Sequence, residues 1–218
     1  MIAISNRFTI TLNPLVLLLP LSITLFTSNI SGQTDSSKRF EQPGLGNRSQ
    51  ILDLEVIRGV AQMVSDSFGA PVDLVEAFIR EAKELERDEG VPATAFIGIA
   101  ILESAGFTSY LYQNAKNPFG MRATKIWKGP TFVMWHEGED AHFRKYEDAR
   151  GAVRDFAAFL NSRKWFRDAL ACGTSDLECF LTAMSPDPIK KEPGYAADPQ
   201  WANKVRRVIK KYGLDRLR

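Results

Sequence analysis

The segment between Val91 and Ala115 constrains the fold most, because Glu103 is its only charged residue. Pro92 stands near the start of this segment, where a helix tolerates proline in its first turn. Gly106 stands where glycine commonly ends a helix, and the apolar residues between them recur at helical spacing. The sequence therefore predicts an apolar helix that carries a single carboxylate close to its end.

Glu103 shares a face of this predicted helix with Phe96, Ile99 and Ala100, which lie seven, four and three positions earlier. Apolar surroundings disfavour the charged form of a carboxylate and raise its pKa, as a general acid at neutral pH requires. Two other interpretations stay open: a buried glutamate with structural hydrogen bonds, or a side chain that reaches solvent at the helix end. Glu103 is the first candidate catalytic residue.

The N-terminus is typical of a targeting segment. Arg7 precedes an apolar run, residues 14–26, which is about as long as the core of a signal peptide. We expect residues 1–32 to be a signal peptide or an uncleaved membrane anchor. The polar residues 33–50 indicate a linker, so the catalytic domain is expected over residues 51–218 of a secreted or periplasmic protein.

Composition narrows the choice of partners. The 218 residues are 44% hydrophobic and 25% charged, which is ordinary for one globular domain. The formal net charge of +2 is too small to indicate nucleic-acid binding. It is compatible with a polyanionic cell wall without arguing for one, and membrane contact is expected only through the N-terminal segment.

Hydrophobic periodicity predicts a mainly helical domain. Helices are expected over Ile51–Ser67 and Pro71–Glu89, ahead of the central apolar helix. The last helix should be capped by Asp198, with Pro199 in its first position. Further helices are expected near residues 153–160, 165–170 and 177–184.

Two β-rich segments, Thr131–Trp135 and Ala141–Tyr146, predict a hairpin around a polar tip. The tip includes His136 and Glu137, and His142 follows. A zincin motif needs two histidines four residues apart on a helix, whereas these are six apart across a turn. We therefore expect no metal site here.

Cys172 and Cys179 are close in sequence and follow a candidate signal peptide, which points to one disulfide across a short interhelical loop. Two free buried thiols are the alternative. Earlier in the chain, Asn117-Pro118-Phe119-Gly120 predicts a tight irregular loop. The ring of Phe119 could stack on a sugar or plug the core.

Four motifs occur in order: AILES around Glu103, NPFGMRA around Phe119, FRKYEDARGAVRDFAAFL from Phe143, and GYAADPQWANKV around Tyr195. Together they resemble the bacterial glucosaminidase domain, glycoside hydrolase family 73, which cuts peptidoglycan glycan strands. The resemblance covers roughly residues 77–214. It implies a mainly α, lysozyme-like domain of the α+β type, with a small β-hairpin lobe flanking a substrate groove.

The resemblance also assigns roles. It implies that Glu103 is the general acid and that Glu137 supplies a second carboxylate from the hairpin, with Glu139 as the neighbouring alternative. Tyr195 matches the active-site tyrosine of the family's Gly-Tyr-Ala-Thr-Asp-Pro motif, in which Ala197 here replaces the threonine.

Phe119 matches the family's groove phenylalanine, although Pro118 stands where leucine is more usual. The candidate substrate-binding residues are Phe119, Asn117, Tyr110 and Trp135.

The function implied is that of an endo-β-N-acetylglucosaminidase, which cuts the β-1,4 bond after N-acetylglucosamine without a metal or organic cofactor. Two alternatives stay open. The first is a muramidase or lytic transglycosylase of lysozyme-like fold, and the second is a wall-binding module without turnover.

Overall fold

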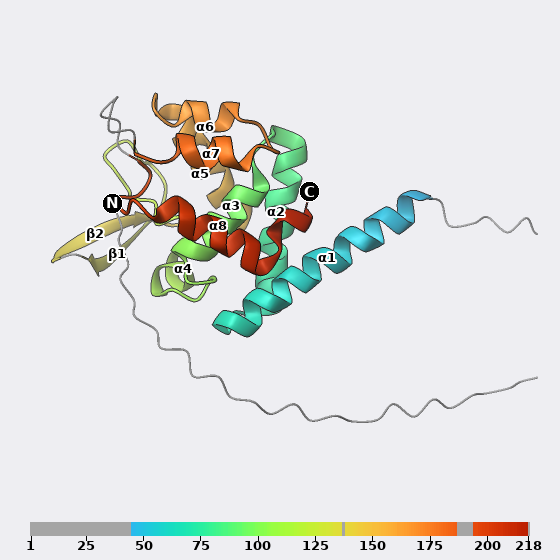
Figure 1. The fold of residues 1–218 in the computed structure, drawn as a ribbon. Helices are drawn as coiled ribbons and strands as arrows, with labels where there is room; N and C mark the ends of the chain where they lie inside the picture. Colours follow the sequence, from blue (N-terminus) through green and yellow to red (C-terminus); the bar gives the residue numbers. More distant parts are fainter. Residues whose placement is uncertain (1–44, 137, 187–193, 218) are drawn as a thin grey trace, which may run out of the picture.

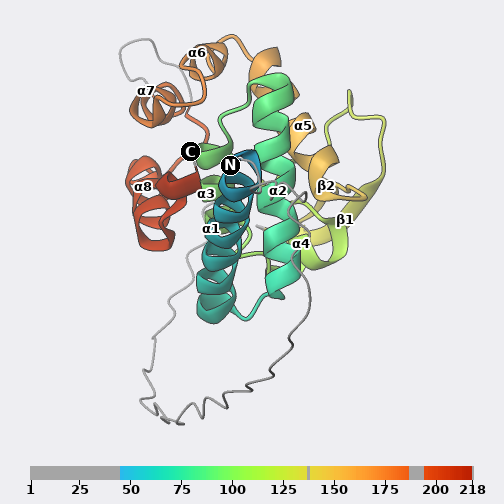
Figure 2. The same ribbon diagram turned by 90° about the vertical axis from the view of Figure 1, so that its right-hand side faces the viewer.

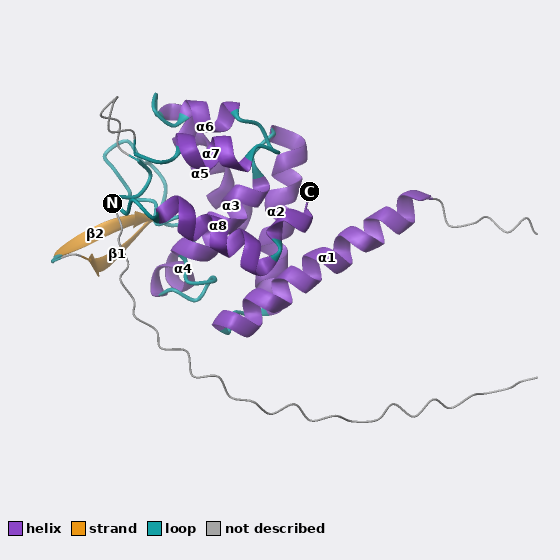
Figure 3. Cartoon of the chain, viewed as in Figure 1, coloured by secondary structure: helices purple, strands orange, loops and turns teal. Residues whose placement is uncertain are grey.

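The computed structural model describes residues 45–136, 138–186 and 194–217 (Figure 1). This part of the chain is mainly helical, with one two-stranded antiparallel sheet at its edge (Figure 3), as expected. The elements are α1 Leu45–Phe68, α2 Val72–Glu89, α3 Ala93–Glu103, α4 Tyr110–Ala115, β1 Thr131–His136, β2 Glu139–Arg144, α5 Ala149–Ser162, α6 Arg167–Ala171, α7 Leu177–Ala183, α8 Trp201–Tyr212 and the 3-10 helix η1 Leu214–Leu217.

The expected signal peptide or anchor, residues 1–32, lies outside the described residues. The end of the expected linker is helical, because α1 begins at Leu45, directly after Pro43 and Gly44, and not at Ile51. No proline lies between Leu45 and Ile51, so the helix can extend back to the Pro43-Gly44 pair. Within the part of the chain that is described, no helix is long and apolar enough to cross a membrane.

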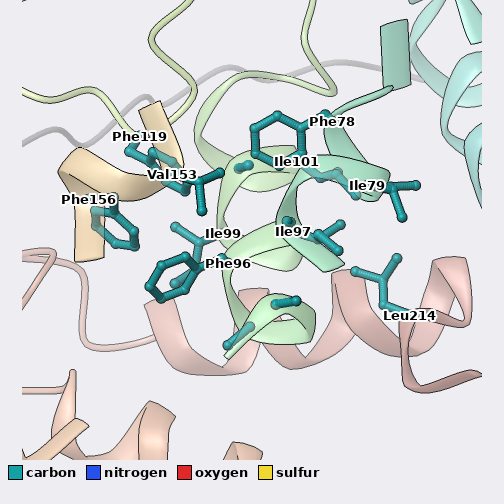
Figure 4. Packing of buried hydrophobic residues seen from close by; sticks show 14 of the residues in the cluster. Phe78, Ile79, Phe96, Ile97, Ile99, Ile101, Phe119, Val153, Phe156 and Leu214 are labelled. Atoms are coloured by element: carbon teal, nitrogen blue, oxygen red, sulfur yellow. The ribbon is translucent and has the colours of Figure 1, made fainter. Parts of the chain in front are cut away.

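The apolar segment forms α3, which lies at the centre of the helical domain. Every residue from Ala93 to Ile101 is buried. The helix is packed against α2, α7, α8 and η1, so it has no solvent-facing side (Figures 1 and 4). Figure 2 shows that α1 and α2 lie side by side and extend this packing outward. Glu103, the last residue of α3, is only half-buried.

Aromatic rings join α3 to α5. The rings of Phe119 and Phe156 are stacked, with centroids 4.1 Å apart and planes 8° from parallel (Figure 4). Phe96 of α3 meets Phe156 edge to face at 4.9 Å. Phe119 is thus held in the core, and the exposed stacking ring considered for the 117–120 loop is not what the structure shows.

The hairpin is tighter than the sequence indicates. His136 pairs with Glu139, so only residues 137 and 138 stand between the paired strands. Gly138 has a φ of 88°, a backbone conformation that glycine readily adopts in two-residue turns. Both strands therefore continue further into the polar tip than expected.

A charged cluster fastens the hairpin to α5. Arg144 Nη1 lies 2.7 and 2.6 Å from the two carboxylate oxygens of Asp155, and the Tyr146 hydroxyl donates to the same carboxylate at 2.5 Å. Arg144 is almost fully buried, so its charge needs this partner. The cluster orients β2 relative to the helical domain.

Two helical boundaries differ from expectation, and the disulfide is confirmed. The predicted loop after Gly106 contains α4, whose N-terminus is capped by the Ser109 side chain. Helix α8 begins at Trp201, because Asp198 accepts a hydrogen bond from the Gln200 amide and caps the preceding turn. Cys172 and Cys179 are bonded, joining α6 to α7.

Gly98 allows α3 and α8 to approach closely. A Cβ atom at this position would lie 2.7 Å from Ile209 Cγ1. We expect Gly98→Ala to lower the free energy of unfolding by about 1–3 kcal/mol, as overpacking does. Denaturant titration would measure this loss.

Gly59→Ala is the matched control, because a Cβ at this exposed position of α1 meets nothing within 4 Å. It should raise the free energy of unfolding by about 0.5–1 kcal/mol. Equal stabilisation by both substitutions would contradict a tight contact between α3 and α8.

Candidate active site

The backbone after Glu103 leaves the helix abruptly. Ala105, Gly106 and Phe107 all have positive φ, at 51°, 62° and 69°. The Ser104 hydroxyl donates to the Ala100 carbonyl at 2.6 Å and accepts from the Phe107 amide at 2.8 Å, which holds this turn. The carboxylate therefore stands where the buried helix meets the surface.

Glu103 receives one hydrogen bond from a distant part of the chain. The indole Nε1 of Trp201, the first residue of α8, donates to Glu103 Oε1 at 2.8 Å. Desolvation raises the pKa of Glu103, and this hydrogen bond and the charge of Lys204 oppose the rise. Lys204 is itself paired with Asp198 at 2.5 Å. The net effect favours a protonated carboxyl group at higher pH than usual.

The side chain of Glu103 lines a cleft of about 370 Å³. Its walls come from the loop that follows Phe119, the end of α5 and the chain from Gly194 to Ala196. Three arginines line it, Arg122, Arg144 and Arg163, whereas Glu103 is the one carboxylate among the described lining residues. The cleft thus combines a candidate general acid with positively charged walls.

Tyr195 lines the same cleft as Glu103. Its hydroxyl donates to the Phe119 carbonyl at 2.6 Å, and its ring centroid lies 5.1 Å from that of Trp201. Burial, and then the charge of Glu103, raise the pKa of the phenol well above its ordinary value, so it keeps its proton. Tyr195 holds the two cleft loops together, and its contact with substrate stays a prediction.

Asn117 has a structural role, and its expected contact with substrate stays a prediction. It is 1% exposed, and its amide nitrogen donates to the carbonyls of Met121 and Arg144 at 2.9 and 2.8 Å. Its side-chain oxygen accepts from the Met121 amide at 2.9 Å. These bonds use the polar groups of the amide to join the 117–121 loop to β2. Phe119 lines the cleft, but its ring is only 2% exposed.

Tyr110 and Trp135 are exposed, at 62% and 69%, but neither lines the cleft around Glu103. Tyr110 lies against Phe132 of the hairpin, with ring centroids 5.7 Å apart. Trp135 pairs with Asp140, so it projects from the opposite face of the hairpin to Glu139. A substrate contact through either ring stays a prediction.

Of the two candidates for the second carboxylate, Glu137 and Glu139, the structure describes only Glu139. Glu137 lies outside the described residues. Glu139 is exposed, and its Oε1 lies 3.8 Å from Nη1 of the cleft residue Arg122. Among the residues that are described, no three His, Cys, Asp or Glu side chains are grouped so that they could hold a metal ion.

Trp201 lies within the GYAADPQWANKV motif, but it is not among the site residues predicted from the sequence. Its position in the sequence could have indicated such a role, because the N–H of a buried indole usually needs a hydrogen-bond acceptor. Sequence reasoning also missed the cleft arginines and Trp165, which also lines the cleft. Arg122 and Arg144 lie within two of the quoted motifs, whereas Arg163 and Trp165 lie outside all four. Only the packed structure shows that these residues share one cleft.

Trp201→Phe should raise the pKa of Glu103, because the mutation removes a donor that stabilises the charged carboxylate while keeping an aromatic ring. Carbon-13 NMR titration of the glutamate carboxyl signals would measure the change. Trp127→Phe is the matched control, since that indole donates to the Pro130 carbonyl. An unchanged Glu103 titration in Trp201→Phe would contradict this role of Trp201.

Comparison with known proteins agrees with this geometry. Residues 79–214 match the glucosaminidase family model, described as mannosyl-glycoprotein endo-beta-N-acetylglucosaminidase. The peptidoglycan hydrolase FlgJ of Vibrio parahaemolyticus is 28% identical over 156 residues, which cover 66% of this chain and 48% of the relative. The chain spans about half the length of the curated relatives it matches.

Solved structures show the same fold. The crystal structure of a peptidoglycan hydrolase from Sphingomonas sp. A1 aligns with a TM-score of 0.53 and 26% identity, covering 66% of this chain and 91% of that one. The glycoside hydrolase domain of Salmonella typhimurium FlgJ aligns with a TM-score of 0.53 and 24% identity, covering 66% and 89%. Because the family match spans more than half of the chain and carries all four motifs, this protein belongs to the glucosaminidase family.

Proposed function

We propose that the protein is a peptidoglycan hydrolase that cleaves the β-1,4 bond after N-acetylglucosamine, with Glu103 as the general acid. The observation that carries the proposal is a carboxyl group of raised pKa at the end of a buried helix, facing a cleft. The family match and the relatives named as peptidoglycan hydrolases support the choice of substrate.

The chemistry requires a proton on the leaving glycosidic oxygen and stabilisation of an oxocarbenium-like centre. A protonated Glu103 supplies the proton, because desolvation keeps its carboxyl group neutral at higher pH. Stabilisation of the cationic centre is assigned to Glu137 of the hairpin or to the N-acetyl group of the substrate. Tyr195 and Trp201 position the groups around the acid.

A wall substrate implies a periplasmic or extracellular site of action. We propose that residues 1–32 deliver the domain there, as a cleaved signal or as an anchor. Purified peptidoglycan digested by the protein, reduced with borohydride and analysed by mass spectrometry, tests the function. Reduced N-acetylglucosamine ends are expected. Muramic or anhydromuramic ends would overturn the proposed linkage, and wall binding without fragments would overturn hydrolysis.

Glu103→Gln should lower kcat by at least about 100-fold, since the amide cannot donate the proton. The pKa of Glu103 is higher in the folded protein than in the unfolded chain, so the folded protein binds more protons. The free energy of unfolding therefore falls as the pH rises from the unfolded pKa through the folded pKa. The variant should therefore match or exceed the wild-type melting temperature at pH 7, and the difference should shrink below the unfolded pKa.

Circular dichroism melts at several pH values would measure this stability effect beside the digestion assay. The amide oxygen can still accept the Trp201 hydrogen bond, so the variant should keep the native fold. Activity equal to that of the wild type would remove Glu103 from the mechanism.

Glu137→Gln should lower kcat by about 100-fold, the lower end of the range for a catalytic acid or base. Glu139→Gln should have a smaller effect, because its ion pair with Arg122 is long and exposed. Steady-state rates on one peptidoglycan preparation would compare them. The reverse order would assign the second carboxylate to Glu139, and no effect from either would favour assistance by the N-acetyl group.

A further inference from the structure

We propose that Arg163 forms a subsite for a carboxylate of the glycan substrate, at the end of the cleft formed by α5. The carboxylate belongs either to the peptide stem or to a lactyl group from which the stem has been removed. The inference rests on the proposed function and adds a specificity-determining residue to it.

The charges that line the cleft are unequally neutralised. Arg144 is almost fully buried and is paired through two contacts with Asp155. Arg122 lies 3.8 Å from Glu139, an exposed carboxylate. Arg163 has no carboxylate partner among the residues that the structure describes, although it lines the same cleft as Glu103. Its positive charge is therefore available to an anion in the cleft.

The guanidinium of Arg163 is held in place by an aromatic ring. Its Cζ atom lies 5.3 Å from the centroid of Phe159, one α5 turn earlier. A guanidinium that lies over a ring can still donate two parallel hydrogen bonds from its edge, the geometry that a carboxylate accepts. Trp165 lines the cleft beside it and offers a flat surface for the sugar that carries the carboxylate.

Arg163 also has a backbone role at the end of α5, but this role does not require an arginine side chain. Arg163 follows the last residue of α5, where its amide donates to the Leu160 carbonyl at 3.2 Å. A positive charge at the C-terminal end of a helix also interacts favourably with the helix dipole and stabilises the helix. That effect would act on stability alone and would be independent of the charge of the substrate. Substrate charge therefore separates the two roles.

The test compares wild type, Arg163→Gln and Lys164→Gln on one peptidoglycan before and after its carboxylates are converted to amides with carbodiimide and ammonia. Lys164→Gln is the matched control, because it removes an exposed positive charge next to Arg163 but outside the cleft lining. The measured quantity is kcat/KM, with the melting temperature of each variant as the check on folding.

Arg163→Gln should lower kcat/KM on the native wall about tenfold, as expected when a charged hydrogen bond is lost. Amidation should lower the wild-type value similarly and leave Arg163→Gln nearly unchanged. Arg163→Lys should recover part of the preference for the native wall. Equal sensitivity of wild type and Arg163→Gln to amidation, or equal losses in Arg163→Gln and Lys164→Gln, would overturn the proposal.

Glycan strands stripped of their peptides separate the two sources of the carboxylate. Stripping frees the lactyl carboxylate, so an Arg163 effect that persists on these strands assigns the ligand to this group, and an effect that disappears assigns it to the peptide stem. Co-sedimentation of Glu103→Gln, with and without Arg163→Gln, on the same walls reports the contact without turnover. Failure of wild type to release fragments would refute the proposed function, whereas an Arg163-independent affinity would refute only this subsite.

Discussion

Burial of α3 from Ala93 to Ile101 is the constraint on which the rest of this structure depends. A helix without a polar face is stable in water only when neighbours cover all of its sides, and here α2, α7, α8 and η1 do so. The single charged residue then has one acceptable place, at the helix end where the core meets the surface. Glu103 occupies that end, and partial desolvation gives it the raised pKa of an acid.

Helix α8 links the packing of the core to the chemistry of the acid. Gly98 lets α8 come close to α3, and the first residue of α8, Trp201, then reaches the carboxylate with its indole N–H. The same helix brings Lys204 near enough to oppose the rise in pKa. One packed interface therefore determines both stability and the protonation of Glu103, which is why core substitutions there should also affect function.

The hairpin lobe depends on a buried charge pair. Asp155 of α5 binds Arg144 and Tyr146 at the end of β2, and a partner left alone in this position would be strongly destabilising. Arg144 is thereby committed to structure, although it lines the cleft. Arg163, which lies over the ring of Phe159, retains its charge for a ligand, so arginines in one cleft serve different purposes.

The sequence by itself determined the mainly helical architecture, the hairpin, the disulfide and the position of Glu103. These depend on local spacing or on one motif series, so a linear pattern contains them. Tertiary structure decided which side chains surround the acid. Asn117 and the ring of Phe119 are buried in the core. Trp201 contacts Glu103, and Arg163 lines the same cleft, although both are far from Glu103 in sequence. Such contacts arise from the packing of whole helices, and no periodicity along the chain records which residues that packing brings together.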